Sequence, residues 1–112
     1  MPRNPLWSRD ELVLAVDTYL RHGAMHKDHP VVLELSRQLN QLGQDIPHPD
    51  PDRFRNPNGV AMKLANFAAL DPGYEGTGFA HGGRRDAEVW DEFHAEPELL
   101  ARAVRIIRER LS

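Results

Sequence analysis

The stretch FRNPNGVAMKLANF, residues 54–67, constrains both the fold and the function of this chain more than any other part of the sequence. Asn56 followed by Pro57 is typical of a helix start, because an asparagine side chain caps free N–H groups and proline favours the first helical position. Apolar residues then recur with helical spacing, as at Leu64 and Phe67. The sequence therefore predicts a helix that begins directly after the asparagine.

Four further helices are predicted around this one. Residues 8–11, SRDE, have the form of a capping box, and Pro30 is a good first-turn residue. The expected helices cover about 9–22, 30–42, 57–70, 86–94 and a last segment that starts near Pro97. A proline-rich loop at 43–55 and a glycine-rich loop at 71–84 separate them. We thus predict a mainly α fold, a compact bundle of about five helices with at most a small β element, forming a single domain over residues 1–112.

The apolar positions of these helices predict one shared core, since each helix is too short to be stable alone. Eight side chains at helical repeats are expected to meet in it: Leu12, Val16, Leu35, Leu39, Leu64, Phe67, Trp90 and Leu100.

Composition narrows the classes of protein to which the chain can belong. The 112 residues carry a formal net charge of −3 and contain no cysteine, which excludes disulfides and thiolate zinc sites. No signal peptide and no apolar run long enough to span a bilayer is visible, so we expect a cytoplasmic protein without a membrane partner. The acidic net charge also argues against a surface that is basic all over and binds nucleic acid non-specifically, though it permits a local basic patch.

Such a patch is predicted within residues 53–70, which hold three cations and no acid. Arginine and lysine bind phosphates, and asparagine can bond to an adenine edge. The candidate DNA-binding residues of this window are Arg53, Arg55, Asn56, Asn58, Lys63 and Asn66, of which Lys63 and Asn66 are expected on the exposed side of the helix. Arg84 and Arg85 follow two glycines and form a second basic point on the glycine-rich loop.

A purely structural interpretation of the same residues stays open at this stage. The asparagines are common as caps and turn residues, Arg55 could pair with a distant acid, and Lys63 could simply be solvated. The two loop arginines could likewise be solvated.

Metal binding and catalysis have little support in the sequence. Six histidines are present, but their spacing matches neither a zinc pattern nor an HNH pattern. No Walker loop and no G-x-S-x-G motif occurs. We therefore expect no cofactor, no metal and no enzymatic activity in this chain.

Four segments together resemble a known family. NPLWSRDELVLAVDTYL, HPVVLELSRQLN, FRNPNGVAMKLANFAALDP and GRRDAEVWDEF are similar to the N-terminal segment of McrA-like HNH endonucleases, which are type IV, modification-dependent restriction enzymes. The resemblance covers about residues 4–105. In that family further modules follow, including readers of modified DNA and a C-terminal HNH nuclease. This chain has neither the HNH motif nor zinc-binding cysteines, so nuclease activity is not carried over to it.

The resemblance implies an accessory head that touches DNA. We therefore expect a DNA-binding module of a modification-dependent restriction system, with double-stranded DNA and the other domains of a parent nuclease as partners. The alternative is a protein-interaction head that dimerises or docks on those domains without contacting DNA.

Overall fold

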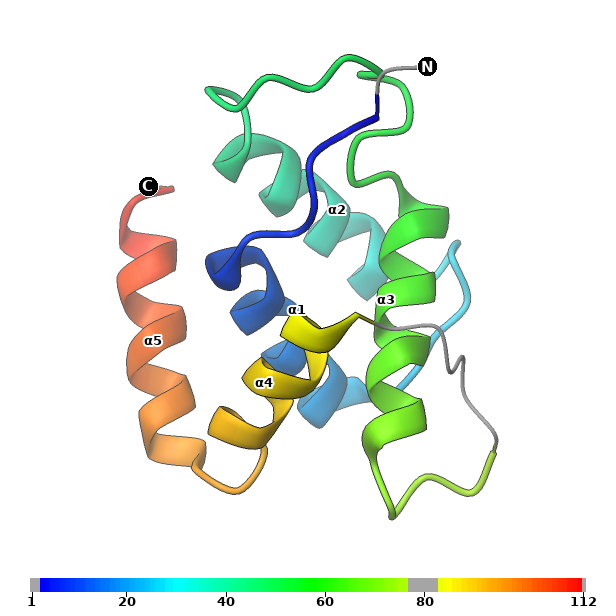
Figure 1. Cartoon of the computed structure of the whole chain (residues 1–112), viewed down its shortest axis with the longest axis vertical. Coiled ribbons are helices and arrows are strands. Elements are labelled where there is room, and N and C mark those ends of the chain that lie inside the picture. Colours follow the sequence, from blue (N-terminus) through cyan, green and yellow to red (C-terminus); the bar gives the residue numbers. More distant parts are fainter. Residues whose placement is uncertain (1–2, 77–82, 112) are drawn as a thin grey trace.

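Five helices form the fold over the part of the chain that the structure describes, as predicted. A computed structural model describes residues 3–76 and 83–111, and Figure 1 shows how the helices are arranged. The helices are α1 (Arg9–His22), α2 (Pro30–Leu42), α3 (Pro57–Leu70), α4 (Arg84–Phe93) and α5 (Pro97–Glu109). No strand occurs in these two ranges, and no helix within them is long and apolar enough to cross a membrane.

Helix α1 is the centre of the bundle. It packs against each of the other four helices, and Figure 1 shows α3 and α5 on opposite sides of it. Every residue from Glu11 to Tyr19 is buried. A helix covered on all sides must place its polar residues against partners, because a buried polar group without one is costly.

The helix ends form for the local reasons that the sequence indicated. Ser8 accepts the N–H of Glu11, and the Glu11 carboxylate accepts the N–H of Ser8, so the capping box is present. The Asn56 side chain accepts the N–H of Gly59 at 2.8 Å and caps α3. Gly23 ends α1 with φ 78°, a left-handed conformation that glycine adopts without steric cost.

The start of α4 differs from the prediction. The helix begins at Arg84, two residues earlier than expected, with Gly83 as its N-cap. Arg84 and Arg85 therefore lie in the first helical turn and not on the glycine-rich loop. The reason is Asp86, whose carboxylate at the third helical position accepts the N–H of Gly83 at 3.1 Å. Residues 77–82 of that loop lie outside the described residues.

The predicted core is confirmed. All eight expected side chains belong to one cluster of buried residues, and Leu64 and Phe67 are fully buried. The cluster also contains Val60, Val104 and Ile107, so α3 and α5 both contribute continuous apolar faces.

The proline-rich segment between α2 and α3 is tied to the chain's N-terminal end. Asn4 bonds the backbone of Asp50 twice, donating to its carbonyl at 2.9 Å and accepting its N–H at 3.0 Å. Phe54 is buried and stacks on His48 with ring centroids 4.3 Å apart. We call residues 4–8 the N-terminal strap, because they run over the bundle and are held by this segment.

Replacing Phe67 with alanine should lower the free energy of unfolding by about 3–5 kcal/mol, because the ring is completely buried in the core and stacks on Trp90 of α4. Urea unfolding followed by tryptophan fluorescence measures this loss. Met62 on the same helix is substantially exposed, so Met62→Ala is the matched control and should change stability little. Equal losses in both variants would contradict the packing described here.

Candidate nucleic-acid interface

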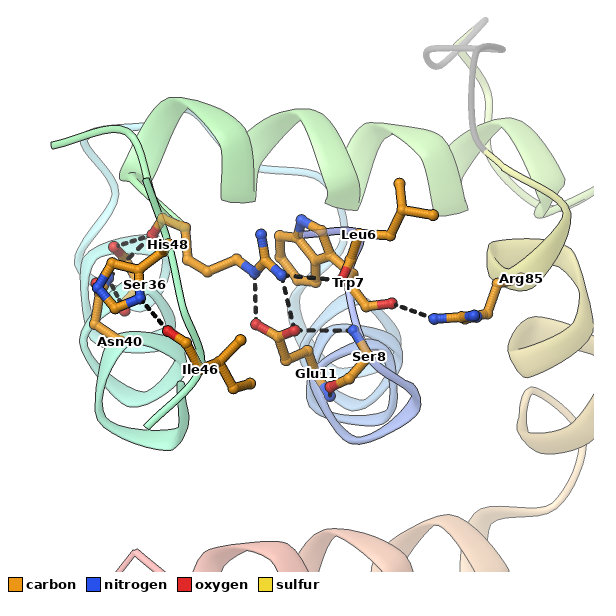
Figure 2. Close-up of polar contacts among 10 residues, drawn as sticks. Leu6, Trp7, Ser8, Glu11, Ser36, Asn40, Ile46, His48 and Arg85 are labelled. Carbon is orange, nitrogen blue, oxygen red and sulfur yellow. Dashed lines mark hydrogen bonds and ion pairs between the residues drawn. The ribbon is translucent and has the colours of Figure 1, made fainter. Parts of the chain in front are cut away.

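Arg55 is the candidate whose position differs most from the expectation. Its side chain is buried, with 4% exposed, and its Nε lies 2.5 Å from Glu11 Oε2. Its Nη2 donates to Glu11 Oε1 at 2.9 Å and to the Leu6 carbonyl at 3.2 Å. In Figure 2, dashed lines mark these contacts at Glu11 and at Leu6. The guanidinium therefore directs its donors into the protein.

The backbone of Arg55 is fixed as firmly as its side chain. Its φ of 48° is unusual for a residue with a Cβ and costs conformational energy. The Arg55 carbonyl accepts the hydroxyl of Ser36 at 2.6 Å and the amide of Asn40 at 3.4 Å. Two side chains of α2 thus hold the turn from which α3 begins.

Aromatic rings complete the surroundings of this guanidinium. Its central carbon lies 4.4 Å from the ring centroid of Phe54 and 5.2 Å from that of Trp7. Both distances allow a cation–π attraction, which is stronger where water is excluded. The expectation that Arg55 contacts phosphate is therefore corrected: the structural alternative, pairing with a distant acid, describes this residue.

The three asparagines differ in accessibility. Asn56 uses its side-chain oxygen as the cap of α3. Asn66, expected on the exposed side of α3, is buried with 6% exposed, which corrects its prediction as a reader of base edges. Asn56 is half-buried, whereas Asn58 is exposed and donates its amide to the sulfur of Met62 at 3.7 Å.

The other two cations of the window also face acids. Arg53 is 81% exposed and lies 3.7 Å from the Asp50 carboxylate. The Lys63 ammonium lies 2.9 and 3.1 Å from the two oxygens of Asp86, a buried carboxylate. Each cation within residues 53–70 therefore has its acidic partner outside the window. Pairing inside the protein thus accounts for these cations without any contact to DNA.

Lys63, Arg84 and Arg85 nevertheless come together along one groove. With Leu6 and Trp7 of the N-terminal strap they line a hollow of about 610 Å³ between the strap and the start of α4. Because α3 supplies the lysine and α4 the arginines, the groove exists only in the folded chain. We call it the strap groove.

The arginines of the strap groove are its most accessible charges. Arg84 has a side chain that is 93% exposed and pairs with Glu88 at 3.1 Å. Arg85 is exposed and donates to the Trp7 carbonyl at 3.0 Å, as Figure 2 shows. Three cations face two carboxylates here, Asp86 and Glu88, so the groove has a small positive balance within an acidic protein.

Two more features of the strap groove suit an anion. The Lys63 ammonium lies 5.4 Å from the ring centroid of Trp7, so the indole forms one wall beside a cation. The N-terminus of α4 is capped by Gly83, which has no side chain to cover the free N–H groups of the first turn. Such N–H groups and the helix dipole favour negative charge.

Other kinds of site have less support in the structure. Within residues 3–76 and 83–111, no three histidine, aspartate or glutamate side chains gather in a way that could hold a metal ion. Comparisons with protein-family models, with curated proteins and with solved structures found no match to this chain. The geometry of the strap groove is therefore the main evidence on function.

Sequence reasoning missed the acids that complete these contacts. The sequence pattern indicates only a capping role for Glu11, and no local pattern pairs Asp86 with Lys63. Glu11 is 44 residues from Arg55 and Asp86 is 23 residues from Lys63. The one available signal was the acid-free window itself, because buried or half-buried cations require acids from elsewhere.

Replacing Arg55 with methionine should cost about 3–5 kcal/mol of stability, because Glu11 would remain buried without its counter-charge. The double variant Glu11→Gln/Arg55→Met should be more stable than Arg55→Met alone, since it removes both charges and leaves an oxygen that can accept the N–H of Ser8. Urea unfolding of the two variants measures the difference.

The exposed pair formed by Arg37 and Glu34 serves as the control for this experiment. Arg37→Met should change stability little, because water screens that pair. If Arg55→Met were as mild as Arg37→Met, the role assigned to the buried pair would be wrong.

Proposed function

We propose that this chain binds double-stranded DNA by laying a phosphate backbone along the strap groove. The observation that carries the proposal is that Lys63, Arg84 and Arg85 line a single hollow although they come from two helices. Their side chains and the free N–H groups of α4 offer the chemistry that phosphate oxygens need.

The proposed contact is small. Arg84 and Arg85 are the two exposed cations of the groove, while Lys63 is engaged by Asp86. Arg53 and Asn58 are also exposed, but they belong to the first residues of the window 53–70 and do not line the strap groove. A few phosphate contacts give modest affinity, which suits an accessory module that acts beside other DNA-binding domains.

The resemblance to McrA-like nucleases supports the same role. By that resemblance we propose that the chain serves as the N-terminal head of a modification-dependent restriction system. A preference for modified DNA would then arise from this head or from its parent protein's other modules. A comparison of plain with modified duplexes shows whether the head has such a preference.

The salt dependence of binding tests the proposal. With about two phosphates neutralised by Arg84 and Arg85, log K should fall with log salt with a slope of about −2, and Arg84→Gln/Arg85→Gln should remove most of that slope. The measurement is fluorescence anisotropy on plain, methylated, hydroxymethylated and phosphorothioated duplexes at several salt concentrations.

The matched control changes the same amount of charge elsewhere. Arg102→Gln/Arg105→Gln removes two exposed arginines from α5, away from the start of α4 in Figure 1, and should leave the slope unchanged. Lys63→Ala is a poorer probe, because it would leave Asp86 buried without its partner. Absence of salt-dependent binding to all four duplexes at low salt would refute DNA binding.

The second candidate function is a protein-interaction head, and one observation favours it. On α5, Leu99 is 42% exposed and Ile106 is 61% exposed, seven residues apart and thus on the same helical face. Such a stripe suits a helix of a second copy or of another domain. The acidic net charge is also compatible with this role.

If a second copy covers this stripe, Ile106→Glu should convert a dimer into a monomer in light scattering coupled to size exclusion. The exposed Met62 on α3 gives the control, since Met62→Glu should leave the mass unchanged. A wild-type chain that is monomeric at all concentrations would remove self-association from this candidate.

A further inference from the structure

Leu6 of the N-terminal strap is the most exposed large apolar residue in the described part of the chain. It is 84% exposed, whereas Ile106 on α5, the next in order, is 61% exposed. Single exposed leucines are common on protein surfaces, so exposure alone does not indicate a function. The position of Leu6 does, because this residue lines the strap groove together with Arg84 and Arg85.

The backbone at Leu6 is held at two adjacent carbonyls. Its own carbonyl accepts from Nη2 of Arg55 at 3.2 Å, and the next one, that of Trp7, accepts from Nη1 of Arg85 at 3.0 Å. Figure 2 shows the Leu6 side chain pointing away from Glu11. Because rotating the strap to bury this side chain would break both hydrogen bonds, the exposed leucine stays at the groove.

The charges near Leu6 decide which partner fits it. The side chain of Arg84 is 93% exposed, and water screens its pair with Glu88, so a phosphate can compete for the guanidinium. Arg85 is exposed as well, while the other carboxylate of the lining, Asp86, is buried. A leucine beside exposed arginines matches a polyanion that also has apolar surface, as nucleic acid has on the faces of its bases. One leucine is too small an apolar surface to hold an anionic membrane.

We propose that Leu6 enters the DNA duplex as a wedge between neighbouring base pairs while Arg84 and Arg85 hold the adjacent phosphates. This inference rests on the proposed DNA binding and specifies what the strap contributes to it. Stacked bases present their apolar faces only where a step opens, and apolar wedges of this kind kink DNA. The chain therefore prefers duplexes whose steps open at low cost, such as those with a mismatched pair.

The experiment measures fluorescence anisotropy of the full chain with two short duplexes that differ by one central mismatch, at several salt concentrations. We expect the mismatched duplex to bind at least about fivefold more tightly, because its bases are already partly unstacked. Both duplexes should give the same salt slope, since they carry the same number of phosphates.

Leu6→Ser removes the wedge without changing any charge, and the exposed position makes the variant compatible with the fold. It should bring the two affinities to within about twofold of each other and leave the salt slope unchanged. Leu6→Met keeps an apolar side chain of similar size and should keep the preference. The matched control is Leu33→Ser, because Leu33 is 46% exposed on α2 and does not line the strap groove. Circular dichroism establishes that the variants are folded.

The outcomes separate the wedge from the DNA binding on which it rests. Absence of salt-dependent binding to either duplex would overturn both. Salt-dependent binding with equal affinity for the two duplexes would leave DNA binding standing and overturn the wedge alone. A preference that persists undiminished in folded Leu6→Ser would also overturn the wedge, and Leu6 would then serve another contact, such as docking on a domain of the parent protein.

Discussion

The buried pair between Glu11 and Arg55 is the interaction on which the arrangement of this small bundle depends. Removing two charges from water is costly, and the attraction between them offsets this only when the remaining hydrogen-bonding groups are also satisfied. Here Glu11 accepts from Ser8 as well as from Arg55, and Arg55 also donates to Leu6. The pair therefore joins the first turn of α1, the N-terminal strap and the start of α3 at one point.

The strap groove is a consequence of that pair. Arg55 holds the strap at the Leu6 carbonyl, and Arg85 holds it one residue later at the Trp7 carbonyl. With the strap fixed in this way, the indole of Trp7 lies beside the ammonium of Lys63. The buried cation of this pair thus sets the position of the strap, and the strap forms the wall of the groove opposite the accessible cations of α4.

The structure separates the basic residues of this acidic chain into two roles. Arg55 and Lys63 compensate the buried acids Glu11 and Asp86, so their positive charge is largely used inside the protein. Arg84 and Arg85 are exposed and available to a partner. A local excess of cations in a sequence is therefore weak evidence for nucleic-acid binding until the acids that face it are known.

The sequence by itself determined the helices and the core. Caps such as Ser8 and Asn56, helix-starting prolines and apolar repeats act within a few residues, so they were visible without the fold. The N-terminus of α4 was placed two residues late, because its glycine cap gives a weaker signal than a polar one. The tertiary structure alone decided which charges are buried and which are exposed. Pairs such as Glu11 with Arg55 join residues 44 positions apart, and only the packing of α1 against α3 brings them within hydrogen-bond distance.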